Sequence, residues 1–402
     1  MRITALETIR VGAMPNLLWL RIHGEDGLTG LGETFFGTSA VEADLHDRLA
    51  PLLLGEQAGQ IERLNRRMQP YAGFSGTGAE QRALSAVDVA LWDLKGKVAG
   101  LALCDLLGGR MRERIPVYNT CAGPRYLTAA DGVRPENFGS AGAVTRGRHE
   151  DLEGFLHYPE DVASSLLEMG ISGMKIWPFD FAAGARDGSD IARDDLARAL
   201  QPFERIRAVH GDRMRVKAEL HGLWTLNAAR KICRALEPLE PDWIEDPIWM
   251  DRTPDLALLA REIRAPLAGG ETLAGLGAFS SLVETSAVAT PIIDITWGGG
   301  VTVARKVAAL AEARGRTVAF HDCMGPVTLA VSTHLALALP NVREQEISRG
   351  FYFSWYGDFV DALPPLAGDG TITVSEGAGL GVSLLADLHR RSDASQRITR
   401  MS

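Results

Sequence analysis

The sequence has little positive charge and few cysteines. Its 42 Lys and Arg residues are outnumbered by 51 Asp and Glu, which gives a net charge of −9, and the basic residues form no run. Nucleic acids and acidic membranes are bound by concentrated positive charge, so neither partner is expected. The four cysteines include no Cys-x-x-Cys pair, which indicates free thiols in a reducing cytoplasm.

Long hydrophobic runs are also missing. No window approaches the ~18 uninterrupted apolar residues that would span a membrane. Residues 1–15, "MRITALETIRVGAMP", alternate in the manner of an edge strand and lack the charged and apolar regions of a signal peptide. A cytoplasmic protein is therefore expected.

The chain is long enough for one large domain and a smaller one. It has 402 residues, of which 46% are hydrophobic and 23% charged, an ordinary globular composition. Strand-like runs joined by "GEDG" precede a helical pattern ending at Gly108-Gly109, so residues 1–114 are predicted to form a small α+β capping domain. Residues 363–402 return to strand-and-turn texture and are expected to complete this domain.

Between residues 115 and 362, short apolar runs alternate with helical patterns. The eight predicted strands are "IPVYNTCAG", "GISGMKIWP", "RVKAELHG", "DWIEDPI", "PLAGGE", "PIIDITWGG", "TVAFHDC" and "NVREQEI". Eight such β/α units favour a closed parallel barrel. A doubly wound sheet is the alternative, but no Gly-x-Gly-x-x-Gly follows a first strand. The long loops 124–158 and 179–190 would shape or cover a site at the barrel mouth.

A polar or charged residue ends each of these apolar runs from the second strand onward. After Glu219 the spacings are 26, 26, 23, 27 and 25 residues, about one β/α unit each. One such residue could be a surface charge, but a repeated spacing places all of them around one mouth, where barrel enzymes carry out their chemistry. The set is Lys175, Glu219 with His221, Glu245, Glu271, Asp294, His321 and Glu346.

Three of these residues are successive carboxylates. Glu219, Glu245 and Glu271 have no Cys or His at ligand spacing beside them, so together they offer oxygen donors alone. Without a cation, converging carboxylates would repel one another and take up protons. Hard oxygen ligands with open positions predict a Mg²⁺ site.

Two histidines are candidates for proton transfer. Asp294 lies one unit before His321, and a carboxylate bonded to one imidazole nitrogen fixes the tautomer and raises the basicity of the other. His221 follows Glu219 by two residues, so both share a strand face, and it could donate a proton beside the metal or serve only a structural role. In "VREQEI", Glu344 and Glu346 also share a face; we expect Glu346, nearer the strand end, to be functional.

The ordered motifs resemble those of the enolase superfamily, in its mandelate racemase branch. "DGLTGLGET" and "SAVDVALWDLKGKVAGLALCDLLGG" look like the capping domain of that family. "AELHG", "WIEDP", "GGET", "DITWGGGVT" and "FHDCMGP" follow in the expected order, and the likeness covers nearly the whole chain. It implies a modified (β/α)₇β barrel that binds Mg²⁺ and removes the proton α to a carboxylate.

Position by position, the resemblance implies metal ligands at Glu219, Glu245 and Glu271 and a His–Asp dyad at His321 and Asp294. Glu219 stands where many members have aspartate. The resemblance also implies that the Glu346 acid hydrogen-bonds a carboxylate oxygen of the substrate. Glu33 in "GLGETF" is expected to be structural.

The second barrel strand departs from the family pattern. Many members carry Lys-x-Lys here, with the second lysine as a base, but this chain reads Lys175-Ile176-Trp177. Without that lysine a racemase lacks a base on the second face of the α-carbon. The arrangement of His321 as base and His221 as acid is similar to that of the acid-sugar dehydratases of the branch. Lys175 would then lie near the substrate carboxylate or a metal ligand.

The sequence therefore predicts a Mg²⁺-dependent dehydratase of a small sugar acid, within a homo-oligomer as is common in the superfamily. An epimerase or lactone cycloisomerase is the alternative, and a non-catalytic binding or scaffold barrel is the third possibility. Hydroxyl recognition is assigned to residues 12–16, 35–39 and 71–78. Phe36, Phe74, Trp177 and Trp297 are the expected substrate contacts.

Overall fold

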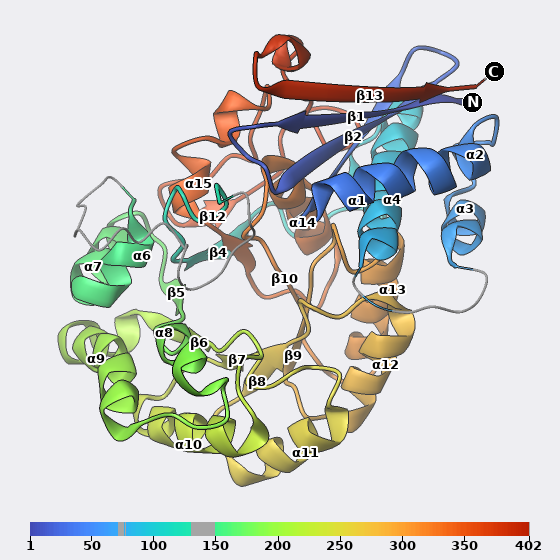
Figure 1. Cartoon of the computed structure of the whole chain (residues 1–402). Coiled ribbons are helices and arrows are strands. Elements are labelled where there is room, and N and C mark those ends of the chain that lie inside the picture. The colour runs from blue at the N-terminus through green and yellow to red at the C-terminus, as the bar shows by residue number, and fades with distance from the viewer. Residues whose placement is uncertain (71–75, 77, 130–148, 402) are drawn as a thin grey trace.

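The computed structural model describes residues 1–70, 76, 78–129 and 149–401. It contains an antiparallel sheet with helices packed on it, set against the open end of a larger parallel barrel (Figure 1). This arrangement confirms the predicted fold class, a modified barrel with an α+β cap.

The cap is built on a four-stranded antiparallel sheet in the order β13-β1-β2-β3. Its strands are β1 (Ile3–Val11), β2 (Leu17–Gly24), β3 (Thr29–Phe35) and β13 (Ala394–Arg400). Its helices are α1 (Thr38–Ala43), α2 (Ala50–Leu53), α3 (Ile61–Met68), α4 (Ala79–Ala99) and α5 (Leu103–Leu106). The first and last strands pair although they lie at opposite ends of the chain.

Helix α4 packs tightly on β3 because two glycines leave room for it. A Cβ atom on Gly30 would lie 1.9 Å from the Ala90 carbonyl oxygen, and one on Gly32 would lie 2.1 Å from that of Ala86. The motif "TGLGE" is therefore a packing motif, in which glycine permits the backbones of helix and strand to meet.

The barrel has eight parallel strands in the order β10-β9-β8-β7-β6-β5-β4-β11, and an isolated parallel bridge between Val318 and Val342 closes it. The strands are β4 (Ile115–Thr120), β5 (Gly173–Ile176), β6 (Arg215–Glu219), β7 (Ile244–Glu245), β8 (Leu267–Gly269), β9 (Thr290–Ile293), β10 (Ala319–Phe320) and β11 (Gln345–Ile347). All eight predicted strands are present.

Helices connect these strands and form the outer layer (Figure 1). They are α6 (Asp151–His157), α7 (Pro159–Glu168), α8 (Asp180–Ala183), α9 (Arg193–His210), α10 (Leu226–Leu236), α11 (Thr253–Glu262), α12 (Gly275–Thr285), α13 (Gly300–Glu312), α14 (Pro326–Ala338) and α15 (Arg349–Tyr352). Among the described residues, none of these or the cap helices combines the length and apolar composition needed to cross a membrane.

The C-terminal segment is shared between the two parts of the molecule. We expected residues 363–402 to complete the cap, and β13 does so by pairing with β1. However, β12 (Thr371–Ile372) pairs antiparallel with barrel strand β4. The alternating apolar and polar residues of 371–374 fit a strand in either sheet, so the sequence pattern could not assign this strand to the cap or to the barrel.

Buried carboxylates of the cap hold the first turns of two barrel helices. Glu33 accepts hydrogen bonds from the backbone N–H of Thr328 at 3.0 Å and from its hydroxyl at 2.7 Å, at the start of α14. Asp88 accepts one from the Thr302 N–H at 2.9 Å, at the start of α13. Negative charge is favourable at a helix N-terminus, so these bonds fix the cap over the barrel mouth. Glu33 thus has the structural position expected for it.

Candidate active site

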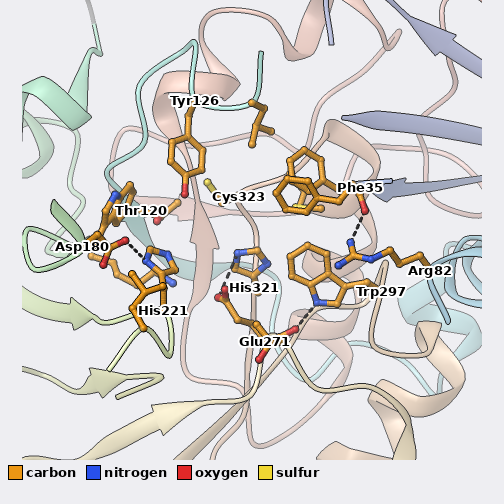
Figure 2. A pocket seen from close by; sticks show the side chains of 17 residues that line it. Phe35, Arg82, Thr120, Tyr126, Asp180, His221, Glu271, Trp297, His321 and Cys323 are labelled. Atoms are coloured by element: carbon orange, nitrogen blue, oxygen red, sulfur yellow. Dashed lines mark hydrogen bonds and ion pairs between the residues drawn. The ribbon is translucent and has the colours of Figure 1, made fainter. Parts of the chain in front are cut away.

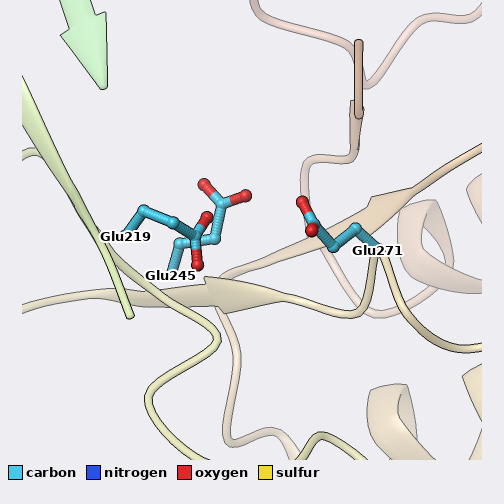
Figure 3. Close-up of side chains that lie close together, drawn as sticks. All are labelled: Glu219, Glu245 and Glu271. Carbon is cyan, nitrogen blue, oxygen red and sulfur yellow. The ribbon is translucent and has the colours of Figure 1, made fainter. Parts of the chain in front are cut away.

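The three predicted ligand carboxylates meet at the barrel mouth. Register pairs Glu219 with Glu245 on neighbouring strands, and Glu271 follows directly after β8. One oxygen of each lies within 4.8 Å of the others, and all three side chains are buried (Figure 3). The one-unit spacing in the sequence thus becomes one cluster of oxygen donors.

Two carboxylates of this cluster, Glu219 and Glu245, are oriented by their own neighbours in the sequence and by Lys175. The backbone N–H groups of Leu220 and His221 donate to Glu219 Oε1 at 3.0 and 2.7 Å. The Trp243 indole donates to Glu245 Oε2 at 2.8 Å. These bonds aim the remaining oxygens at a common point.

Lys175 lies inside the cluster as an ammonium ion. Its Nζ is 2.6 Å from Glu245 Oε1, 2.9 Å from Glu346 Oε1 and 3.3 Å from Glu219 Oε2. Burial lowers the pKa of Lys175, but the surrounding carboxylates, Glu245 most strongly, raise it by a larger amount. The pKa of Lys175 therefore lies well above its usual value. The carboxylates around Lys175 thus favour its charged form.

The two candidate acids, Glu346 on β11 and Glu344 just before this strand, are distinguished by the cations that they meet. Glu346 lies beside Lys175 and also accepts the Asp322 N–H at 2.9 Å. Glu344, two residues earlier in the chain, pairs with Lys217 at 2.9 Å and with Arg215 at 2.7 Å. Glu346 is therefore the residue that belongs to the mouth.

The predicted dyad is formed at the ends of β9 and β10. His321 Nδ1 lies 2.7 Å from Asp294 Oδ2, and the other oxygen of Asp294 accepts the N–H groups of Thr296 and Trp297 at 2.7 and 3.0 Å. Asp294 is fully buried, and these hydrogen bonds occupy both of its oxygens. The ring of His321 therefore presents Nε2 to the pocket, 3.4 Å from Glu271 Oε2.

Trp297 forms one wall of the pocket beside this dyad. Its ring stacks on that of His321, with 5.3 Å between centroids and 21° between planes, and its indole N–H donates to the Glu271 carbonyl. The guanidinium of Arg82, from the first turns of α4, lies 4.5 Å from the ring centroid of Trp297 (Figure 2). Arg82 is a pocket residue that the sequence reasoning missed, because nothing in its helical pattern marks it.

His221 also has a carboxylate partner, which the sequence reasoning missed. His221 Nδ1 lies 2.6 Å from Oδ2 of Asp180, the first residue of α8 in the loop after β5. In Figure 2 this pair lies on the side of His321 opposite Trp297. Asp180 stands three residues after Trp177 in "KIWPFD", and only its place in a long loop at the mouth could have suggested it.

One cavity of about 360 Å³ lies between cap and barrel, and Lys175, His221, Glu271 and His321 are the charged or titratable groups of the predicted set that line it. Phe36 from the cap and Trp177 and Trp297 from the barrel are among its walls, as expected for substrate contacts. The described part of the loop 124–158 contributes Tyr126 and Leu127, so that loop does reach the site. Phe74, the fourth expected contact, lies outside the described residues. Phe35 belongs to the segment 35–39 that was assigned to hydroxyl recognition, and further lining residues that the sequence did not indicate are Thr120, Thr272, Cys323 and Met324.

The excess of carboxylates raises the affinity of the site for protons. Burial raises the pKa of Glu245 to about 8, and repulsion from Glu219 adds to this effect while Lys175 opposes it. Burial lowers the pKa of His321, but Glu271 and Asp294 raise it more, to about 10. The carboxylates around both groups contribute negative charge that a bound cation would offset.

The donor set fits a hard divalent cation. Glu219 Oε2 and Glu271 Oε2 are buried and, within the described residues, meet only the ion-pair contacts to Lys175 at 3.3 Å and to His321 at 3.4 Å, without a hydrogen bond. Carboxylate oxygens alone, with room left for water or substrate oxygens, are the ligands that Mg²⁺ prefers. Glu219, Glu245 and Glu271 are thus the residues that would hold it.

Family comparisons match both parts of the chain. Residues 6–108 match the mandelate racemase / muconate lactonizing enzyme N-terminal domain, and residues 158–388 match the enolase C-terminal domain-like family. D-Galactonate dehydratases of Verminephrobacter eiseniae and Ralstonia nicotianae are each 30% identical over 90% of this chain and 85% of theirs.

Solved structures match over the whole length. An enolase of the mandelate racemase subgroup from Agrobacterium tumefaciens is 42% identical with a TM-score of 0.87, over 100% of this chain and 99% of that one. An enolase protein from the Sargasso Sea environmental genome is 41% identical with a TM-score of 0.88 over the same shares.

Proposed function

Because the chain belongs to the enolase superfamily, in its mandelate racemase / muconate lactonizing enzyme family, we propose that it is a Mg²⁺-dependent acid-sugar dehydratase. It removes the proton α to the carboxylate of an aldonate or aldarate and expels the β-hydroxyl as water. The product is a 2-keto-3-deoxy sugar acid. The curated relatives named D-galactonate dehydratase make D-galactonate the first candidate substrate.

The observation that supports this proposal is that His321 and His221 line one pocket with Glu271 and Lys175, beside the cluster that Glu271 forms with Glu219 and Glu245. His321 Nε2, oriented by Asp294, takes the α-proton. Glu346, as the neutral carboxylic acid, donates a hydrogen bond to one substrate carboxylate oxygen, and Lys175 supplies positive charge next to that group.

The second half of the reaction falls to His221. As the C–O bond at the β-carbon breaks, its electron pair leaves with the oxygen, and His221 protonates that oxygen to release water. The enol that remains tautomerises to the 2-keto acid. When bound among Glu219, Glu245 and Glu271, Mg²⁺ supplies the positive charge that offsets the carboxylate field and stabilises charge developing on the substrate.

Trp177 supports elimination over two-sided proton transfer. Its ring is 1% exposed and packs against Phe155 at 5.3 Å and Tyr126 at 5.8 Å between centroids. An apolar wall therefore occupies the position where racemases of the branch need a second lysine. An epimerase or cycloisomerase on the same barrel remains the competing proposal, and the convergence of the whole charged set gives no support to a non-catalytic barrel.

The test is turnover of a panel of aldonates and aldarates, scored for 2-keto acid with Mg²⁺ and with EDTA. We expect at least one member to be dehydrated only with Mg²⁺. Glu245→Gln should abolish this activity, and Glu262→Gln, which alters an Arg230 ion pair on the outer surface, should retain it. A folded, metal-loaded protein that dehydrates no member would contradict the proposal.

We further propose a homo-oligomer, on the basis of the superfamily resemblance. Light scattering coupled to gel filtration measures this, and a monomeric mass at micromolar concentration would contradict it.

A further inference from the structure

Asp180 is a buried carboxylate with a specific partner in the pocket. Its side chain is 1% exposed, whereas that of His221 is 25% exposed, and both line the cavity described above. The 2.6 Å contact between Asp180 Oδ2 and His221 Nδ1 joins the loop after β5 to the end of β6. One side of the imidazole is thus fixed from within the protein, and the other side faces the cavity.

The backbone also fixes His221. Its N–H donates to Glu219 Oε1 at 2.7 Å, and its φ of 49° places it in the left-handed region, which is uncommon for residues other than glycine. The Trp177 ring meets the imidazole edge-on at 5.8 Å between centroids. With Nδ1 bonded to Asp180, Nε2 is the nitrogen that can meet a substrate.

This arrangement repeats that of the base. Asp294 bonds His321 through Nδ1 at 2.7 Å, and Asp180 bonds His221 through Nδ1 at 2.6 Å. A carboxylate on Nδ1 fixes which nitrogen carries the exchangeable proton and the direction in which the ring points. The pocket therefore contains two imidazoles with the same kind of support.

The bonding of Asp180 differs from that of a buried carboxylate with a structural role. Asp151, 2% exposed, uses both oxygens on Arg349, at 2.7 Å each. Asp180 uses one oxygen on His221, and within the described residues its Oδ1 has no hydrogen-bond partner. Burying a carboxylate is costly unless its hydrogen bonds are made, so Asp180 is poorly explained as a stabilising contact alone.

We propose that Asp180 is the positioning residue for the water-releasing half of the reaction, acting through His221. This inference rests on the proposed dehydratase function. Asp180 holds the Nδ1–H of His221, so that Nε2–H is directed at the departing β-hydroxyl. The C–O electron pair leaves with oxygen, the Nε2 proton goes to that oxygen, and water departs. Removal of the α-proton by His321 does not involve Asp180.

The test separates the two half-reactions in D₂O. Wild-type protein is first shown to form 2-keto acid, and the same substrate is then given to Asp180→Asn and to the control Asp190→Asn, which alters an exposed carboxylate of the same loop. Loss of a positioned general acid costs about 10²–10⁴-fold, so we expect 2-keto acid formation by Asp180→Asn to fall by at least ~100-fold. Deuterium should still appear at the α-carbon of recovered substrate.

The ratio of exchange to elimination does not depend on how much of the variant is folded. A merely structural Asp180 would lower exchange and elimination together, which would overturn the proposal, as would unchanged elimination. A substrate with fluoride in place of the β-hydroxyl adds a second ratio, because fluoride needs less proton transfer to leave. We expect Asp180→Asn to lose less activity on it than on the hydroxy acid, and equal losses would contradict the proposed role.

A readout without substrate is the proton signal of the histidine–aspartate hydrogen bonds. In metal-free protein labelled with ¹⁵N-histidine we expect two strongly deshielded Nδ1–H protons. Asp294→Asn should remove one and Asp180→Asn the other, and both surviving in Asp180→Asn would overturn the proposal. If the wild-type protein dehydrates none of the sugar acids tested, the proposed dehydratase function is wrong. The proposed role of Asp180 is then wrong as well, even if the proton signal shows the Asp180–His221 hydrogen bond.

Discussion

At the scale of single residues, the site is a balance between buried charges of opposite sign. Lys175 contacts Glu245, Glu346 and Glu219 at 2.6 to 3.3 Å while only 3% of its side chain is exposed. Its ammonium compensates part of the carboxylate charge and leaves the rest for a cation and a substrate. The lysine is thus both a structural and an electrostatic component of the site.

Replacing Lys175 with Met keeps the length of the side chain and removes its charge. Breaking a buried pair typically costs 3–5 kcal/mol, so we expect the free energy of unfolding of the metal-free variant to fall by about 3 kcal/mol. Saturating Mg²⁺ should restore part of this loss by compensating the same carboxylates. Urea denaturation with EDTA and with Mg²⁺ measures both values, and an unchanged stability without metal would contradict the charge balance described here.

Replacing Asp294 with Asn tests the base. The amide can no longer hold Nδ1–H of His321 as a carboxylate does, so α-proton removal should slow by about 10²–10⁴-fold. Because elimination follows proton removal, deuterium exchange and 2-keto acid formation should fall together, unlike in Asp180→Asn. Exchange that persists in Asp294→Asn would show that another group is the base.

The sequence could predict those residues whose positions repeat. The ligands and the dyad end consecutive strands, so their spacing alone placed them at one mouth. Asp180 and Arg82 do not end strands: Asp180 lies in a loop and Arg82 on a cap helix, and their places depend on tertiary packing. The choice between Glu344 and Glu346 required knowing which cations each meets, Lys217 and Arg215 for Glu344 and Lys175 for Glu346.

At the scale of elements, polar groups of the cap and the C-terminal segment fix the helices that carry the site. His334 in α14 accepts the Cys104 N–H from α5 at 3.2 Å and lies 3.1 Å from the Leu380 carbonyl. It is fully buried, and this burial lowers its pKa to about 4. The neutral imidazole therefore joins three segments that are distant in the sequence.

This histidine makes stability depend on pH. Below pH 6.5 the unfolded chain binds a proton at His334 and the folded chain does not, so the free energy of unfolding falls as the pH decreases toward 4. At about 1.4 kcal/mol per pH unit, this position contributes a loss of about 2 kcal/mol between pH 7.5 and 5.0. Urea denaturation at both values should show a loss smaller by that amount in His334→Gln. Equal losses in the variant and the wild type would contradict this assignment.

The sequence predicted the elements better than their partners. All eight barrel strands were found because each contains a short apolar run, and from the second strand onward a polar residue ends that run. The pairing of Thr371–Ile372 with β4 was not found, since a two-residue strand has no periodicity of its own. The eight-strand closure follows from the number of repeats, whereas the attachment of the last 40 residues depends on contacts that no local pattern records.

At the scale of the whole molecule, the cavity exists because cap and barrel are held together. Phe36 and Arg82 line the cavity from the cap, and Trp297 and His321 line it from the barrel. The helix-capping bonds of Glu33 and Asp88 hold the cap in place on the barrel. The substrate therefore meets walls from both parts. A metal bound under this cover should stabilise the fold as a unit.

Magnesium should raise the stability of the protein without any substrate. A ligand at 100 times its dissociation constant stabilises the native state by about 2.7 kcal/mol. Thermal unfolding across a Mg²⁺ series, from an EDTA baseline, should show a rising Tm for the wild type and for Glu262→Gln, and a much weaker rise for Glu245→Gln. A Tm of the wild type that does not respond to millimolar Mg²⁺ would argue against the proposed metal site.

The most direct measurement of the central claim follows a productive sugar acid in D₂O with NMR detection. The account predicts a 2-keto acid that carries deuterium at C3, formed with the loss of one water and without accumulation of the α-epimer. Deuterium at the α-carbon of recovered or epimerised substrate, with no 2-keto acid formed, would contradict the dehydratase and identify an isomerase on the same barrel.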